Sequence, residues 1–370
     1  MSVYTALYPF CAEFMSTVRH FNEIQKDYHL CSLISPSGLG LDGRDASHAC
    51  NHPPIGLNVT SQLSPRKSKW EILIVAKPLH EKGISDDMLV FAVKSTLDAG
   101  KRVVYCDNRA LHRIPSEIRA LINDSNGRLS FASCSSNPIM PFEDPYQHQP
   151  IRTPIIVVGG LIQEPDVSEV LISIARQATS VGMRPLVFAN HSVGHIMGFH
   201  SISHIFDNTA LSEAEKAKAI NRAIADIVDL AAPDVVLIEA PDALMRFDEN
   251  IPNGFGIKSF MLCQAISPDF LVACIPYPFV SAHTVRQLGE DFIHRFGTPL
   301  AAIHISNTVV DMIELAQFLE ISYVYNNIAT VRDKIDRDKA SISIPVYNIL
   351  EETSPEKLLE HLCDSSIGQV

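Results

Sequence analysis

Residues 154–181 read as a strand, a short loop and a helix, the order of a phosphate-binding loop, but the residues that would hold phosphate are missing. A working loop follows G-x-x-x-x-G-K-[ST], because backbone amides and one lysine surround the phosphates of a nucleotide. Counted from Gly160, this chain has Pro165, Asp166 and Val167 at the Gly, Lys and Ser or Thr positions. Proline removes an amide donor, and the carboxylate repels phosphate. The pattern predicts a P-loop-like architecture without ATP or GTP hydrolysis.

A second glycine-rich segment, residues 38–43, matches the G-x-G-x-x-G pattern of dinucleotide-binding proteins and follows a predicted strand that ends at Ser35. That pattern needs a helix that begins inside the motif and presents its N-terminus to a pyrophosphate. Residues 44–51 have no apolar face and run into Pro53-Pro54, so no such helix is expected. We predict a ligand loop at the carboxyl edge of a strand, where open α/β sheets bind ligands. A glycine-rich loop without a ligand is the alternative. The predicted ligand-binding residues of the chain are Gly38, Gly40, Gly43, Arg44, Asp45, Gly159, Gly160 and Asn253.

Four histidines, His191, His195, His200 and His204, follow a predicted strand at Pro185–Ala189. On one straight helix the first two would lie at about 0° and 40° and the last two at about 180° and 220°, so the four cannot meet there. We predict that His200 is a catalytic residue that transfers protons, because an imidazole titrates near neutral pH. A core or helix-capping histidine is the alternative.

Glu239 is the second predicted catalytic residue, and it ends a predicted buried strand, Val235–Ile238. In nucleotide hydrolases a carboxylate at this position helps to hold the Mg²⁺ ion of the bound nucleotide. This chain lacks the loop lysine that binds the nucleotide phosphates, so Glu239 is not expected to hold Mg²⁺ in this way. A carboxylate at the end of a buried strand is costly unless it is paired, so we expect Glu239 in the site.

Two groups of residues contain the side-chain types that bind metals. His48-x-Cys50-x-His52 would place three ligands on one side of an extended segment, a set suited to zinc or iron. The histidines at 191–204 form the other group. Neither matches a pattern of known specificity, so no metal is predicted, and metal binding by either group stays open.

The elements that must position these residues alternate between strands and helices, which is typical of parallel sheets with crossover helices. We therefore predict an α/β fold with two domains. Residues 1–135 would form a Rossmann-like parallel sheet, and residues 151–370 a degenerate P-loop NTPase-like parallel sheet, joined by a proline-rich linker at 136–150. In the first domain we predict helices at Ala12–Lys26 and Asp86–Ala99, and strands at Val3–Tyr8, His29–Ile34, Ile72–Ala76 and Val103–Cys106.

Helix-capping patterns are clear in the second domain. Asp166 with Glu169 predicts a capping box for the helix that follows the P-loop-like junction, and Ser212 with Glu215 predicts a second one. The predicted strands of this domain are Pro154–Val158, Pro185–Ala189, Val235–Ile238, Phe270–Ile275, Leu300–Ile305 and Tyr323–Tyr325.

Composition limits the function classes. The formal net charge is −12. Residues 1–135 carry 15 Lys and Arg against 13 Asp and Glu, and the remainder carries 15 against 29. A surface this acidic repels a phosphate backbone, so a nucleic-acid partner is not expected. The longest apolar run, near Phe270–Val280, is too short to span a bilayer. With no secretion signal and eight scattered cysteines, we expect a cytoplasmic protein without disulfides or membrane contact.

Several short segments together are typical of a known family. They are Tyr8–Phe10, Leu33–Pro36, Gly38–Ala46, Val157–Asp166, Gly198–Ser201, Asn253–Ile257, Ile266–Asp269 and Pro345–Leu350. These segments resemble the peptide maturation system proteins of clostridial and related bacteria, which are associated with gene clusters for ribosomally made, modified peptides. The resemblance implies a role in peptide modification and a precursor peptide or a maturation enzyme as partner.

The layout is also similar, more distantly, to two-domain proteins with a Rossmann-like and a P-loop-like part, some of which transfer acetyl groups from coenzyme A to amino acids. Those proteins carry the loop lysine that this chain lacks. The leading hypothesis is an accessory or modifying component of a peptide-maturation pathway that binds a small ligand or peptide in an interdomain cleft. A coenzyme A-type acyl transferase and a non-catalytic peptide-binding scaffold are the alternatives. No cofactor is identified, and a homodimer stays open.

Overall fold

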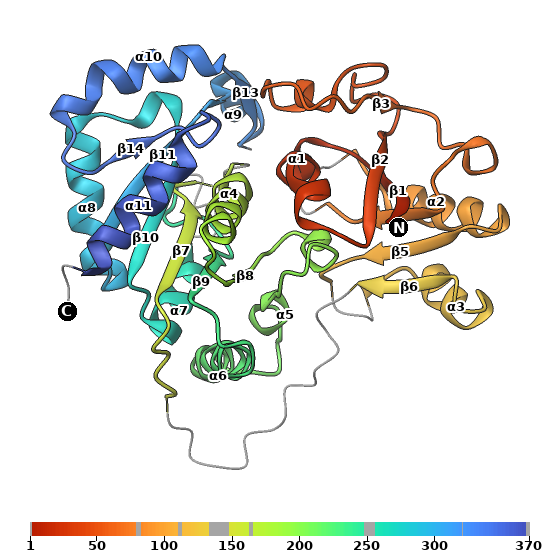
Figure 1. Cartoon of the computed structure of the whole chain (residues 1–370), viewed down its shortest axis with the longest axis horizontal. Helices are drawn as coiled ribbons and strands as arrows, with labels where there is room; N and C mark the ends of the chain where they lie inside the picture. Colours follow the sequence, from red (N-terminus) through yellow and green to blue (C-terminus); the bar gives the residue numbers. More distant parts are fainter. Residues whose placement is uncertain are drawn as a thin grey trace. The chain divides into compact units, whose positions relative to one another are not determined.

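Each half of the chain builds a parallel sheet of its own (Figure 1). The chain divides into two compact units, one of Met1–Pro138 with Asn190–His204, the other of Ile139–Ala189 with Ile205–Val370. The predicted α/β fold class, with a Rossmann-like and a P-loop-like parallel sheet, is confirmed. This computed structural model describes residues 2–78, 83–109, 113–132, 148–162, 166–247, 256–319 and 321–367.

The sheet of unit 1 has the strand order β3-β2-β1-β4-β5-β6, and its described pairs are all parallel. This is the 3-2-1-4-5-6 order of dinucleotide-binding folds, in which ligands bind at the carboxyl ends of the strands. The strands are β1 (Val3–Tyr8), β2 (Tyr28–Ile34), β3 (Val59–Thr60), β4 (Ile72–Ala76), β5 (Arg102–Cys106) and β6 (Leu129–Ala132).

The helices of unit 1 do not cover every crossover. The connections β1–β2, β4–β5 and β5–β6 contain α-helices, whereas β2–β3 and β3–β4 contain only short 3-10 turns among the described residues. The α-helices are α1 (Met15–Ile24), α2 (Asp86–Asp98) and α3 (Ser116–Asp124); the 3-10 turns are η1 (Ala12–Phe14), η2 (Ala46–Ala49) and η3 (Pro65–Lys67).

A segment from the second half of the sequence belongs to unit 1. Residues 190–204 leave the second sheet after β8 and include the 3-10 turn η5 (Ser192–His195), which lies against β5 and β6. The Ser192 hydroxyl donates to the Lys77 carbonyl at 3.0 Å, and the Asn108 amide donates to the Asn190 carbonyl. The expected C-terminal domain, residues 151–370, therefore includes a segment that belongs to unit 1, because these residues contact the loops that follow β4 and β5.

The sheet of unit 2 has the order β14-β11-β10-β7-β9-β8, so the strand before the P-loop-like junction is central. Both of its neighbours run parallel to it. The strands of this sheet are β7 (Ile155–Gly160), β8 (Pro185–Phe188), β9 (Val235–Glu239), β10 (Phe270–Pro276), β11 (Leu300–Ser306) and β14 (Val346–Tyr347). The predicted strand at Tyr323–Tyr325 exists but pairs outside this sheet, as β13 antiparallel to β12 (Thr308–Val310).

The helices of unit 2 form two layers. In one, α4 (Val167–Ser180) packs against α11 (Ser354–Ile367) and against β7, β8 and β9. In the other, α7 (Ile257–Ile266) packs against both α6 (Glu213–Ala231) and α8 (Ala282–Phe296). Strands β7 and β10 are buried along their whole length, as expected for a parallel sheet covered on both faces. The remaining helices are α5 (Ser203–Phe206), α9 (Met312–Phe318) and α10 (Ile328–Asp338).

The start of α6 confirms one predicted capping box. The Ser212 hydroxyl accepts from the Glu215 amide, and the Glu215 carboxylate accepts from the Ser212 amide at 2.7 Å.

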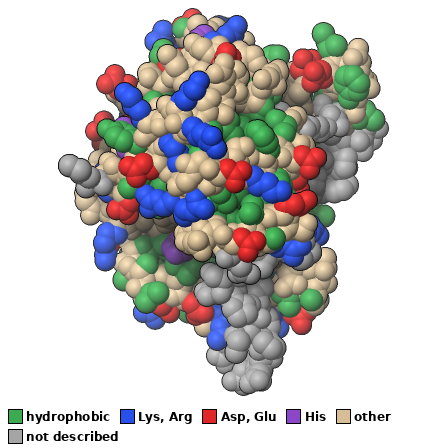
Figure 2. Space-filling view, turned by 90° about the vertical axis from the view of Figure 1, so that its right-hand side faces the viewer, with side chains coloured by type: hydrophobic (Ala, Val, Ile, Leu, Met, Phe, Trp, Pro, Cys, Tyr) green, Lys and Arg blue, Asp and Glu red, His purple; other side chains and the backbone are tan. Residues whose placement is uncertain are grey.

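Lys and Arg side chains on the face in Figure 2 are interspersed with acidic ones. No helix in the described part of the chain is long and apolar enough to cross a membrane.

Candidate functional site

The P-loop-like junction is closed by a buried carboxylate. Asp166 stands at the position of the phosphate-binding lysine, and only 1% of it is exposed. Its Oδ2 accepts from the Ser306 hydroxyl at 2.6 Å and lies 3.3 Å from His304 Nε2. Thr308 donates its backbone amide to Ser306 Oγ at 3.1 Å. We call Asp166, His304, Ser306 and Thr308 the Asp166 network.

A backbone amide fixes the protonation of His304. The Ile349 amide donates to His304 Nδ1 at 3.1 Å, so Nδ1 carries no proton. The proton of the neutral imidazole then lies on Nε2, where it points to the Asp166 carboxylate. The carboxylate is thus paired by two donors at the end of β11, as a buried charge requires.

The predicted capping box of Asp166 with Glu169 is wrong. Among the described residues of the first turn of α4, no backbone amide is capped by the Asp166 side chain. The Asp166 carboxylate instead contacts Ser306 and His304 on β11. The buried Ser306 hydroxyl donates a short hydrogen bond to the carboxylate, and this bond is stronger than one from a local backbone amide at the helix start. The tertiary contact therefore overrides the local capping pattern.

Glu239 pairs with a serine of α4. It ends β9, directly beside β7, where Val158 and Glu239 are register partners. The Ser168 hydroxyl donates to Glu239 Oε1 at 2.8 Å. Ser168 lies one residue beyond Val167, which stands at the Ser or Thr position of the phosphate-binding pattern. The hydrogen bond from Ser168 pairs the Glu239 carboxylate, as expected for a carboxylate at the end of a buried strand.

The glycines of the junction have packing roles. A Cβ atom on Gly159 would lie 2.8 Å from both the Ala240 Cβ and the Leu244 Cδ2 atoms, so this position needs glycine for the approach of the chain after β9. The Gly160 carbonyl accepts from the Leu244 amide at 2.8 Å. Both residues were predicted to bind ligand, and that role stays a prediction. Asn253 lies outside the described residues.

The glycine-rich loop after β2 borders a hollow of about 320 Å³ in unit 1. Three of the five residues predicted there, Gly38, Gly40 and Arg44, line it. Gly38 and Gly40 have φ values of 108° and 69°, which side chains rarely adopt. Arg44 is exposed, and its guanidinium has no hydrogen-bond or ion-pair partner among the residues that the structure describes. The other lining residues are Pro36, Ser37, Leu41, Asp42 and Ser61.

The other two predicted residues of this loop, Gly43 and Asp45, are not among the lining residues of the hollow and hold the loop through hydrogen bonds. The Gly43 amide donates to the Val59 carbonyl at 2.9 Å. The Asp45 carboxylate accepts from the amides of Ser47 at 2.9 Å and Gly56 at 2.7 Å. Burial raises the pKa of Asp45, but these hydrogen bonds outweigh it and hold the pKa below its usual value. Asp45 therefore stays ionised and fixes the loop, and its predicted ligand role stays a prediction.

Sequence reasoning missed a charged cluster at the carboxyl ends of β4 and β5. Arg109 Nη2 lies 2.8 Å from Asp107 Oδ2, and Arg109 Nη1 lies 2.9 Å from Asp86 Oδ2. Lys77 Nζ lies 3.1 Å from Asp86 Oδ1. Two cations and two anions balance each other there. Lys77 and Asp107 each directly follow a predicted strand, which was the available signal. The turn η5 packs against β5 and β6 at the same sheet.

The histidine segment does not form one helix, because Gly198 has a φ of 82° between η5 and α5. Burial lowers the pKa of His191 to about 4. Burial also lowers the pKa of His195 to about 4, helped by the charges of His191 and His200. His200 is half-buried, and burial lowers its pKa as well. Near neutral pH these imidazoles are uncharged.

Neither predicted group of metal-ligand types is gathered into a cluster. Among the described residues, no three His, Cys, Asp or Glu side chains lie close enough to hold a metal ion. Residues His48, Cys50 and His52 are not extended, because η2 runs through the segment. His48 is exposed, whereas the Cys50 thiol is buried and donates to the Ala12 carbonyl at 3.6 Å.

His200 and Glu239, the two predicted catalytic residues, belong to different units. His200 shares unit 1 with the glycine-rich loop, and Glu239 shares unit 2 with the Asp166 network. Each role stays a prediction for its own unit.

The fold and these sites define a class: a two-unit α/β protein with a Rossmann-type first sheet and a P-loop-type second sheet, in which a buried carboxylate, Asp166, stands at the sequence position of the phosphate-binding lysine. No protein-family model matches the sequence. No curated protein matches it either. Among solved structures, a DUF1611 family protein from Anabaena variabilis is similar, with a TM-score of 0.64 and 12% identity, over 98% of this chain and 100% of that chain. At this identity the likeness shows the fold alone.

The buried neutral His191 predicts a pH-dependent stability. An unfolded histidine has a pKa near 6.5, against about 4 for His191 in the folded chain. Between those values the unfolded state binds more protons, so the free energy of unfolding falls as the pH falls through this window. From pH 7 to pH 5 we expect His191→Gln to lose about 2 kcal/mol less stability than the wild type. Denaturant unfolding at the two pH values measures this difference.

His283→Gln is the matched control, because His283 is exposed on α8. It should show the same pH dependence as the wild type. A His191→Gln variant with the wild-type pH dependence would show that His191 is not held neutral in the folded state.

Proposed function

We propose that this chain acts in a peptide-maturation pathway of the cytoplasm as a ligand-binding component, not as a nucleotide hydrolase. Its ligand lies on the glycine-rich loop of unit 1, and the ligand class is a peptide or amino acid derivative. The observation that carries the proposal is the polar hollow at the end of β2 in unit 1. In unit 2, a buried carboxylate stands at the sequence position of the phosphate-binding lysine.

The Asp166 network argues against nucleotide phosphate at the junction. A triphosphate would have to displace a carboxylate that two buried donors already hold. It would also place its negative charge next to that carboxylate, where the low dielectric of the interior strengthens repulsion. Binding there would require breaking a paired buried charge, which costs several kcal/mol.

The hollow at the glycine-rich loop has the charges that a peptide would need. Arg44 offers an unpaired guanidinium for a carboxylate, and Asp42 offers a carboxylate for an amino group. The Asp42 side chain already accepts from the Ser61 amide at 2.6 Å, so it is held in place. Ser37 and Ser61 add hydroxyl groups. Asp42 disfavours the phosphates of a coenzyme A-type ligand, which is why the acyl transferase remains the weaker hypothesis.

The proposed catalytic residue of unit 1 is His200, which belongs to the same unit as the hollow but does not line it. A neutral imidazole accepts a proton, and the lowered pKa keeps it neutral at pH 7. If the chain modifies the peptide, His200 is the proposed base. If it only presents the peptide to a partner enzyme, the same hollow serves as a scaffold and His200 is dispensable.

For unit 2 we expect no binding of nucleotide. Titration calorimetry of the purified chain with Mg-ATP and with Mg-GTP should give no heat of binding at micromolar to millimolar concentrations, because Asp166 fills the lysine position. Micromolar affinity that Gly160→Asp abolishes would contradict this account of the junction.

For unit 1 we expect that Arg44→Glu stops maturation of the cognate peptide in cells that express the full pathway. The charge reversal places two carboxylates in one hollow and removes the guanidinium, while an exposed side chain without partners leaves the melting temperature nearly unchanged. Mass spectrometry of the peptide measures the outcome.

Arg119→Glu, at an exposed position of α3 in the same unit, carries the same charge change and should leave maturation intact. Normal maturation with Arg44→Glu would remove the ligand role of the glycine-rich loop.

A further inference from the structure

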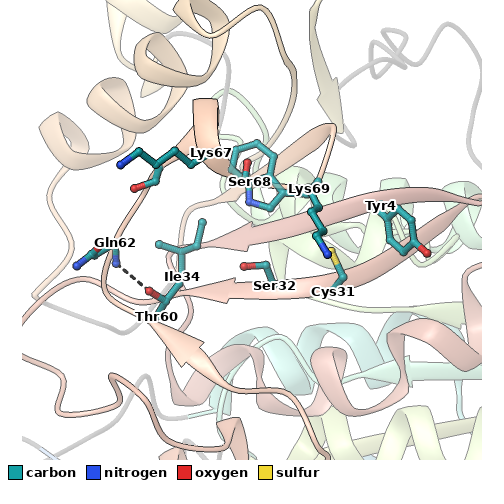
Figure 3. Close-up of a pocket in the computed structure, with 11 residues that line it drawn as sticks. Tyr4, Cys31, Ser32, Ile34, Thr60, Gln62, Lys67, Ser68 and Lys69 are labelled. Atoms are coloured by element: carbon teal, nitrogen blue, oxygen red, sulfur yellow. Dashed lines mark hydrogen bonds between the residues drawn. The ribbon is translucent and has the colours of Figure 1, made fainter.

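A second hollow, of about 490 Å³, lies over the first three strands of the unit 1 sheet (Figure 3). Side chains from β1, β2 and β3 line it, together with residues of the β3–β4 connection. It is distinct from the hollow at the glycine-rich loop, since the two share no lining residue. The lining residues are Tyr4, Cys31, Ser32, Ile34, Thr60, Gln62, Ser64, Lys67, Ser68, Lys69 and Trp70.

The hollow exists because the β3–β4 connection is too short to hold a covering helix. In this fold the crossover from β3 to β4 passes over β2 and β1 and usually carries a helix that buries the sheet. Here the connection spans residues 61–71 and contains only η3. Tyr4 on β1 is 53% exposed as a result. The strand face is therefore open to a ligand of small-molecule size.

The wall nearest β4 is rigid. Trp70 is buried, and the Lys101 ammonium lies 4.4 Å from the centre of its ring. Lys101 Nζ also donates to the Ser68 hydroxyl at 2.9 Å and to the Ser68 carbonyl at 3.0 Å. One cation thus ties two lining residues of the connection to the start of β5. A site whose wall is held in this way needs little reorganisation to bind.

The charge of the lining is one-sided. Lys67 and Lys69 are both exposed, and neither has an ion-pair partner among the described residues. No Asp or Glu lines the hollow, although acidic residues outnumber basic ones in the whole chain. The nearest acid of the connection, Glu71, lies 3.6 Å from the Arg102 guanidinium. Tyr4 is the exposed aromatic side chain of the lining, whereas Ile34 and Trp70 are 1% and 3% exposed and form its buried base.

We propose that this hollow binds a small organic anion with a flat apolar body, whose charged head is attracted by Lys67 and Lys69 and whose body packs against Tyr4. The volume suits a molecule of one or two rings. Burial raises the pKa of Cys31, so its thiol stays protonated and the site binds rather than reacts. The proposal is independent of the function assigned to the glycine-rich loop.

Naphthalene-1-sulfonate is a suitable probe, because it joins an aromatic body to a permanent negative charge. Trp70 is the single tryptophan of the chain, so its emission reports on this wall of the hollow. Titration calorimetry should give one site per chain, and Trp70 emission should change with the same dissociation constant. Lys67→Glu/Lys69→Glu should weaken binding by roughly tenfold or more, since each reversal replaces attraction by repulsion.

Lys94→Glu/Arg119→Glu changes the net charge by the same amount on exposed positions of α2 and α3 and should change the dissociation constant by less than about twofold. Neutral 1-naphthalenemethanol and inorganic sulfate should each compete poorly, since each lacks one half of the ligand. Equal losses in the two double variants, or binding without any change in Trp70 emission, would overturn the proposal. So would equal competition by the neutral alcohol, which would leave only nonspecific apolar binding.

Discussion

The pairing of the Asp166 carboxylate is the interaction on which the second unit depends. It joins the start of α4 to the end of β11. Its two contacts on that strand, His304 and Ser306, follow Asp166 by 138 and 140 residues in the sequence. A buried charge of this kind is tolerated only when donors satisfy it, and here a hydroxyl, an imidazole and a backbone amide behind that imidazole do so. The same contact that closes the junction removes the charge pattern a nucleotide requires.

The proposed ligand sites of this chain therefore lie in unit 1. There the carboxyl ends of β4 and β5 carry the paired charges of Lys77, Asp86, Asp107 and Arg109, with η5 packed against β5 and β6. Two hollows of this unit lie at connections that have no α-helix among the described residues: the glycine-rich loop after β2 and the β3–β4 connection. Both proposals depend on this lack of covering helices in unit 1.

Local patterns were enough to predict the fold class and the long central strands, but not the short strands β3, β6, β12 and β14 or the helix α3. Parallel strands alternate with amphipathic helices, and the Ser212 box is correct because its donor and acceptor lie within one turn. The Asp166 box is wrong because the competing donor, Ser306, lies in a distant strand that no local pattern reveals. The docking of residues 190–204 on unit 1 and the place of Ser61 in the glycine-loop hollow are likewise long-range contacts. Gly38, Gly40 and Arg44 could be predicted because a strand end and a turn-forming sequence mark the loop directly.

A double-mutant cycle on Asp166 and Ser306 tests the central claim most directly. The free energy of unfolding is measured for the wild type, Asp166→Ala, Ser306→Ala and the double variant. Removing the carboxylate leaves a buried hydroxyl without its acceptor, so the account predicts a coupling energy of about 2 kcal/mol between the two positions. Additive losses, with a coupling below about 0.5 kcal/mol, would contradict the claim that this contact holds the junction.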